Sequence, residues 1–259
     1  MINDSLEDRN SQNFKNLNQT KNPQLPAYEL LKQQSDWLAP ARARLLRRVS
    51  IARCHRVLDL GAGYGVVTNE LVRRCNGQVI AIDYNISALF KSSKSSAGAV
   101  HICADSKNLP FSNSIFDLVF SQFSLMWMEV EKVIAEVFRV LKTSGAFVAI
   151  EPDFGGMIEY PEAIASREIW ISALSRSGAD PLIGRKLPSL LKSVGFKIQT
   201  GLIPELLPPS PVRFQFLRGL HLTPEEYKSL ETIEYIDKKL SREATQVVHL
   251  PFFLVTAIK

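Results

Sequence analysis

Residues Val57 to Thr68 read VLDLGAGYGVVT, and this stretch decides the fold class. A short apolar run ends at Leu60, and glycines follow at positions Gly61, Gly63 and Gly65. An apolar strand that leads into a glycine-rich turn and then a helix is typical of parallel α/β folds, which bind ligands at the carboxyl ends of their strands. Glycine permits positive φ and a close approach of the backbone to a ligand. The stretch therefore predicts a ligand-binding loop at that edge of a parallel sheet.

The spacing of the glycines separates the nucleotide-binding loops from one another. A dinucleotide fingerprint reads GxGxxG, whereas here the third glycine, Gly65, comes one position early. A phosphate-binding P-loop ends in GK[ST], and no lysine stands near this turn. The spacing disfavours both an NAD-dependent dehydrogenase and a P-loop protein.

Strand and helix patterns alternate along the rest of the chain. The apolar, β-branched segments are typical of strands that are buried on both faces of a parallel sheet. We therefore predict a doubly wound, mostly parallel, seven-stranded α/β sheet whose last strand is antiparallel, with helical lid insertions. Strands are expected at 56–60, 78–83, 100–105, 116–122, 146–152, 196–203 and 247–259. The last strand has no crossover helix behind it, which favours an antiparallel edge strand.

The domain organisation follows from these patterns. The polar residues 1–24 are expected to form a disordered tail, and 25–259 a single domain. Within that domain we expect N-terminal helices at 25–55, split by Pro40, and a cofactor-binding core at 56–153. Two segments do not fit the repeat, 154–187 and 208–245, and both read as helical insertions over the ligand edge.

Several motifs in register resemble class I S-adenosylmethionine-dependent methyltransferases. The glycine loop follows Asp59, the next strand ends at Asp83, and Asp105 stands in CADSKNLPF. The order NLPFSNSIFDLVFS and the segment EVFRVLKTSGAFVAIEP are similar to the later blocks of that family. The resemblance covers 56–153 and is greatest to the small-molecule branch that includes ubiquinone and menaquinone methyltransferases.

The resemblance implies S-adenosylmethionine as the cofactor and this fold as its scaffold. The loop would pass under the amino-acid half of the cofactor, with Asp59 near its ammonium group. Asp83 would accept hydrogen bonds from the ribose hydroxyls and Asp105 from the adenine amino group. The expected cofactor-binding residues are Asp59, Gly61, Ala62, Gly63, Gly65, Asp83, Tyr84, Asp105, Ser106, Ser121 and Gln122.

The fourth strand ends in SQFSLMWM, which bears on the methyl acceptor. Methyltransferases that act on adenine amino groups carry Asn or Asp, Pro-Pro and an aromatic residue there, so no DNA acceptor is expected. An apolar wall and an aromatic lid favour a small, hydrophobic acceptor. Glu151 and Asp153 are the carboxylates that we nominate as a general base. The residues expected to line the acceptor pocket are Phe123, Met126, Trp127, Met128, Tyr160, Trp170, Phe214, Phe216 and Leu217.

Composition leaves other functions open. Apolar content of 46%, charged content of 22% and a net charge of +5 are ordinary for a globular protein. We see no metal-ligand cluster, no secretory signal and no run long enough to span a membrane, so we expect a cytoplasmic protein. Four arginines, Arg42, Arg44, Arg47 and Arg48, are expected to form a solvated or cofactor-covering helix face but would also support an RNA, peptide or protein acceptor. A non-catalytic, cofactor-binding member of the fold is a further alternative.

Overall fold

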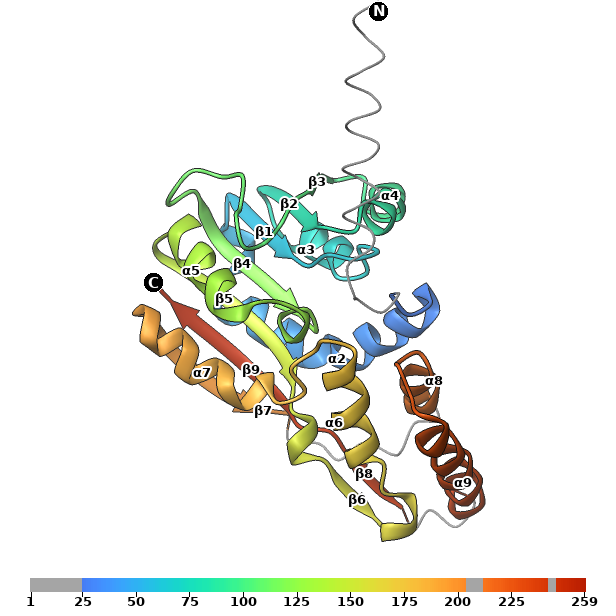
Figure 1. Ribbon diagram of the computed structural model, residues 1–259. Coiled ribbons are helices and arrows are strands. Elements are labelled where there is room, and N and C mark those ends of the chain that lie inside the picture. Colours follow the sequence, from blue (N-terminus) through green and yellow to red (C-terminus); the bar gives the residue numbers. More distant parts are fainter. Residues whose placement is uncertain (1–24, 204–211, 242–245) are drawn as a thin grey trace, which may run out of the picture.

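The computed structural model describes residues 25–203, 212–241 and 246–259 (Figure 1). The predicted tail at 1–24 lies outside the described residues. A seven-stranded sheet with the order β3-β2-β1-β4-β5-β9-β7 forms the centre of the fold. Its strands are β1 Arg56–Leu60, β2 Gln78–Asp83, β3 Ala99–Cys103, β4 Phe116–Gln122, β5 Leu141–Pro152, β7 Lys197–Leu202 and β9 Phe252–Ile258.

The strand directions confirm the predicted mostly parallel sheet. β1 pairs in parallel with β2 and β4, β2 pairs in parallel with β3, and β4 pairs in parallel with β5. β9 runs antiparallel to both β5 and β7. The last strand is therefore antiparallel, as predicted, but its expected place at the sheet edge is wrong. β9 lies between two strands, and β7 forms that edge instead.

Helices cover both faces of this sheet, as apolar side chains on alternate faces of each strand require. Val57 in β1 packs in one apolar core with helix α2, whereas its neighbour Leu58 packs in a second core with helices α5 and α7. The α5 face that carries Val133, Ile134 and Val137 is fully buried. The helices that flank the sheet are α2 Tyr28–Arg48, α3 Thr68–Arg74, α4 Ile86–Ser95, α5 Val130–Val140 and α7 Ile183–Val194.

The N-terminal region differs from the prediction, because one helix, α2, runs unbroken through Pro40. A proline inside a helix leaves the carbonyl four residues before it without its backbone donor, here that of Asp36. Pro40 and the Asp36 side chain both face solvent, where water can bind that carbonyl. The predicted split at Pro40 is therefore wrong.

The two insertions gather at one end of the main sheet, towards which β4 and β5 point (Figure 1). The first contains β6 Ile158–Tyr160 and α6 Arg167–Arg176, and the second contains α8 Val212–Arg218 and α9 Pro224–Leu240. β6 pairs antiparallel with β8, Val247–His249, in a separate two-stranded sheet. Residues 208–211 and 242–245 of the second insertion lie outside the described residues.

The terminal segment was predicted as one strand, and the structure divides it in two, β8 and β9. Pro251 lies at the break and lacks an N–H for a sheet ladder. Short 3-10 turns connect several elements, at Ile51–Arg53, Leu125–Trp127, Phe154–Gly156 and Glu162–Ile164. Within the described ranges, we find no helix that combines the length and apolar character needed to cross a membrane.

Candidate active site

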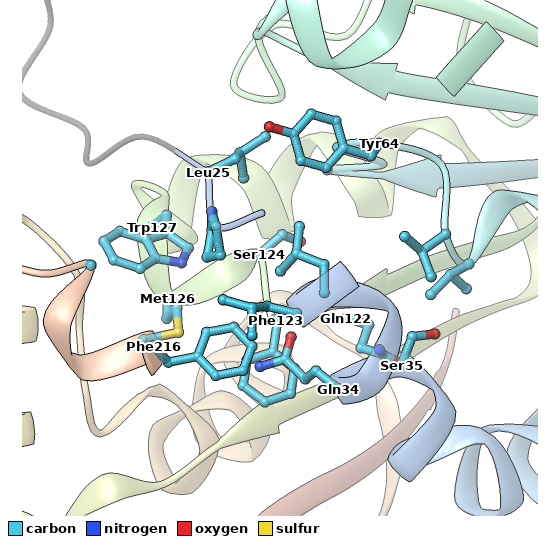
Figure 2. Close-up of a pocket in the computed structure, with 18 of the residues that line it drawn as sticks. Leu25, Gln34, Ser35, Tyr64, Gln122, Phe123, Ser124, Met126, Trp127 and Phe216 are labelled. Carbon is cyan, nitrogen blue, oxygen red and sulfur yellow. The ribbon is translucent and has the colours of Figure 1, made fainter. Parts of the chain in front are cut away.

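A cavity of about 770 Å³ opens at the carboxyl ends of β1, β2 and β4 (Figure 2). Ligand pockets occupy roughly 300–1,000 Å³, so this space suits an organic ligand. Its lining joins the glycine loop and the end of β4 to α2, α6, α8 and the segment between β8 and β9. The cavity therefore connects the α/β core to both insertions.

The glycine loop has the geometry of a ligand cradle. Gly61, Gly63 and Gly65 have φ values of +75°, +52° and +74°, the left-handed region that favours glycine. A Cβ on Gly61 would lie 2.5 Å from Cβ of Ser124, whereas a Cβ on Gly63 would meet no atom within 4 Å. The backbone at Gly63 thus faces open cavity space, and Gly61 packs against the turn after β4.

Two carboxylates flank this loop. Asp59 is buried, lines the cavity and accepts a hydrogen bond from Thr68 Oγ1 at 2.6 Å. Burial raises the pKa of Asp59 to about 6, with the Thr68 bond acting in the opposite direction. Asp83 accepts hydrogen bonds from the backbone N–H groups of Gly63 and Asn85, both at 2.8 Å. Burial raises the pKa of Asp83 as well, so both groups lie in a partly desolvated environment.

The other predicted cofactor residues divide into two groups. Ala62, Tyr84, Ser106 and Gln122 line the cavity together with Gly61 and Gly63, whereas Gly65, Asp105 and Ser121 are not among its lining residues.

Each residue of the second group has a different environment. A Cβ on Gly65 would lie 2.1 Å from Ser92 Oγ, so this glycine permits close packing against α4. Asp105 comes two residues after β3 ends, is exposed and accepts the Lys107 N–H. Ser121 is fully buried, and its Oγ lies 2.7 Å from that of Ser124. Their predicted cofactor contacts stay predictions.

Neither carboxylate nominated as a general base lines the cavity. Glu151 is fully buried, and its Oε1 accepts the backbone N–H groups of Ser124 and Leu125, both at 3.1 Å. Burial raises the pKa of Glu151 to about 8. Asp153 is buried and forms a bidentate pair with Arg185, with contacts at 2.8 and 2.9 Å. Both groups support neighbouring segments, and this placement does not favour a role for either as the base.

The acceptor side of the cavity is apolar. Figure 2 shows Phe123, Met126, Trp127 and Phe216 around one space. Of the residues expected there, six line the cavity: Phe123, Met126, Trp127, Met128, Trp170 and Phe216. Phe214 and Leu217 instead lie in the core, and Tyr160 is 64% exposed. Helical periodicity could not show which face of α8 lines the cavity, because both faces of this helix carry apolar residues.

Sequence reasoning missed the contribution of α2. Several residues between Leu25 and Trp37 line the cavity, and this segment lies beside the glycine loop, where the ring centroids of Tyr28 and Tyr64 are 6.4 Å apart. Of the two expectations for the arginines, a solvated face is wrong for Arg42, which is 3% exposed and bonded to Glu70 and Gln122. Arg44, Arg47 and Arg48 are exposed as expected. No motif marks this helix as part of the site, and only its amphipathic pattern indicated that it packs on the sheet.

Comparisons with known proteins agree with this geometry. Residues 58–149 match the family model described as "Methyltransferase domain". Over 110 residues the chain is 37% identical to malonyl-[acyl-carrier protein] O-methyltransferase of Halorhodospira halophila. The alignment covers 40% of the chain and 37% of that protein. Over 100 residues it is 35% identical to mouse mitochondrial arginine-hydroxylase NDUFAF5, which covers 38% of the chain and 29% of that protein. The matches thus span only 37% and 29% of the lengths of these two relatives.

A solved structure extends the similarity to most of the chain. It is geranyl diphosphate C-methyltransferase from Streptomyces coelicolor A3(2), in complex with Mg²⁺, geranyl diphosphate and S-adenosyl-L-homocysteine. Its TM-score is 0.56 at 14% identity, covering 86% of this chain and 81% of that one. The domain match confirms the resemblance to methyltransferases for residues 58–149, and the solved structure shows the same fold over most of the chain.

Proposed function

We propose that this chain is a class I methyltransferase and transfers a methyl group from S-adenosylmethionine to a small, hydrophobic acceptor. One observation carries the proposal: a single cavity runs from the glycine loop to an apolar wall built by the end of β4 and the insertions. The loop end offers open backbone and carboxylates, whereas the far end offers aromatic side chains. These two environments suit a polar cofactor and an apolar acceptor in one space.

The residues of the loop fit S-adenosylmethionine. Gly63 leaves open space beside its backbone, and the Asp83 carboxylate has lone pairs that can accept hydrogen bonds from ribose hydroxyls. Asp59 places a carboxylate where a cationic ammonium group could lie. When bound, the cofactor would supply an electrophilic methyl group on its sulfonium.

The contribution of the protein would be alignment and the exclusion of water. Holding two reactants in line can contribute about 7–11 kcal/mol in favourable cases. Phe123 and Trp127 would hold an apolar acceptor against the cofactor end of the cavity, and Trp170 and Phe216 would cover it from the insertions. We therefore propose that the two insertions act as a lid over the acceptor.

The first test is the identity of the cofactor. We expect calorimetry to show binding of S-adenosylmethionine and S-adenosylhomocysteine but not of NAD. Asp83→Ala should weaken that binding by about 1–3 kcal/mol, because the ribose hydroxyls lose their acceptor and the Gly63 N–H loses its partner. Glu168→Ala removes an exposed carboxylate from α6 and serves as the control that should bind normally. Binding of NAD alone would contradict the proposal.

The second test is the acceptor. Incubation with methyl-labelled cofactor and cell extract, followed by mass spectrometry, should find the label on an apolar small molecule. Trp170→Ala and Phe216→Ala should lower turnover by about tenfold or more and leave S-adenosylhomocysteine affinity unchanged, since both lie on the acceptor side. Label on protein or RNA would overturn the small-molecule acceptor but keep the methyltransferase activity.

A further inference from the structure

The buried Arg42 connects α2 to the end of β4, although it does not itself line the cavity. Arg42 Nε donates to Glu70 Oε2 at 2.7 Å, and its Nη1 donates both to the Ser35 carbonyl and to Gln122 Oε1, each at 3.0 Å. Glu70 in turn accepts from Arg74 at 2.7 Å. The Arg42 guanidinium is therefore fixed by three partners on two helices and one strand.

This contact determines how the Gln122 amide is oriented. A guanidinium only donates hydrogen bonds, so it must face the amide oxygen of Gln122 and not the amide nitrogen. The nitrogen is then turned away from Arg42, and among the described residues the structure shows no hydrogen bond from it. Gln122 lines the cavity and is half-buried, so its two N–H donors are available to a ligand.

An acceptor of the opposite character lies nearby. Asp59 lines the same cavity from the end of β1, the strand adjacent to β4, and pairs in register with Phe120. Gln122 comes two residues later, at the carboxyl end of β4. The cavity therefore carries a carboxylate on one strand end and an amide donor on the next, beside the glycine loop. A ligand group with both an ammonium and a carboxylate complements this pair.

We propose that Gln122 donates to the carboxylate of the cofactor's amino-acid group, and that Arg42 is the positioning residue that holds the Gln122 amide in this orientation. The inference rests on the proposed function, since it takes S-adenosylmethionine as the ligand. It assigns the two ends of the zwitterion, with the ammonium group on the Asp59 side and the carboxylate on the Gln122 side. The N-terminal helix thereby contributes to cofactor binding through Arg42.

The test compares a ligand that carries the amino-acid group with one that lacks it. S-adenosylhomocysteine carries the zwitterion, whereas 5′-methylthioadenosine has the same nucleoside and thioether without it. Gln122→Glu keeps an oxygen acceptor for Arg42 but removes the donors and adds a negative charge. We expect this variant to bind S-adenosylhomocysteine about 10- to 100-fold more weakly and 5′-methylthioadenosine with unchanged affinity.

Arg42 is tested by the same pair of ligands. Arg42→Met should weaken the binding of S-adenosylhomocysteine but not that of 5′-methylthioadenosine. The double variant Arg42→Met/Gln122→Leu should bind S-adenosylhomocysteine about as well as Gln122→Leu alone, because both residues act through the Gln122 amide. Arg44→Met changes an exposed arginine of the same helix and should bind both ligands normally. If Arg42→Met does not fold, Gln122→Glu alone decides the outcome.

Two results would overturn the inference without affecting the proposed function. One is equal weakening of both ligands by Gln122→Glu, which would mean that Gln122 only supports the fold. The other is normal S-adenosylhomocysteine binding by that variant, which would assign the amide to the acceptor instead. A wild-type protein that binds neither ligand would overturn the proposed function itself.

Discussion

Gly61→Ala is expected to destabilise the fold much more than the same change at Gly63. Both residues have positive φ, which costs an alanine about 1–2 kcal/mol. At Gly61 the new methyl would also lie 2.5 Å from Cβ of Ser124, a buried side chain whose Oγ already donates to the Leu60 carbonyl. Such overpacking adds about 1–3 kcal/mol. Urea unfolding should therefore show a total loss of roughly 2–5 kcal/mol for Gly61→Ala.

Gly63→Ala is the matched control for that result. Its methyl would enter open cavity space and should cost only the backbone contribution to stability. The same methyl would occupy space that we assign to the cofactor, so calorimetry should show S-adenosylhomocysteine affinity reduced by about tenfold or more. Equal unfolding free energies for the two variants would contradict the proposed packing of Gly61. Normal cofactor binding by a folded Gly63→Ala would contradict the proposed cradle.

The core of the fold could be predicted because local patterns determine it. β1, β2 and β4 were predicted to the residue, since each contains a run of apolar residues that is buried in the sheet. The order of strands in the sheet carries no such local signal. β9 is inserted between β5 and β7 by contacts between residues more than 50 positions apart, and nothing in its own sequence distinguishes an edge from an interior place.

The site was predictable where it rests on the glycine loop and less so elsewhere. Asp59, Gly63 and Asp83 converge because strand ends of a parallel sheet meet at one edge. The burial of Arg42 depends on Glu70, which lies 28 residues away in another helix, and on Gln122, which lies 80 residues away. Periodicity within α2 cannot reveal such partners. A charged residue on an apolar helix face therefore reads as solvated until its partner is known.

Glu151 illustrates the same limit. Its position at the end of β5 indicated a catalytic base, whereas the structure places it beneath the turn that follows β4. That turn contains Phe123 with φ of +57°, a conformation that costs a residue other than glycine about 1–3 kcal/mol. The Ser124 and Leu125 N–H groups, which follow Phe123, donate to Glu151 Oε1. These two hydrogen bonds hold the turn and, with it, the cavity wall at Phe123 and Trp127.

Burial of Glu151 has a measurable consequence for stability against pH. Its pKa is raised from 4.5 to about 8, so the folded state retains a proton that the unfolded state releases. The free energy of unfolding should therefore fall as pH rises from about 4.5 to about 8, by on the order of a few kcal/mol. Glu151→Gln keeps an oxygen acceptor for the Ser124 and Leu125 N–H groups but cannot ionise. This variant should lose less stability than the wild type over that interval.

The measurement is urea unfolding of both proteins at pH 5 and pH 8. Asp59 and Asp83 also have raised pKa values, but they contribute equally to the free energy of unfolding of both proteins. Their contributions therefore cancel when the free energy of unfolding of Glu151→Gln is subtracted from that of the wild type. Glu136→Gln is the control, because pairing with Arg139 lowers the pKa of Glu136, and its effect on stability should change only as the pH falls below about 4.5. Parallel loss of stability in wild type and Glu151→Gln would show that Glu151 ionises without cost. It would then be free to act as the base that its place in the sequence indicated, and the acceptor would have to reach it through the turn at Phe123.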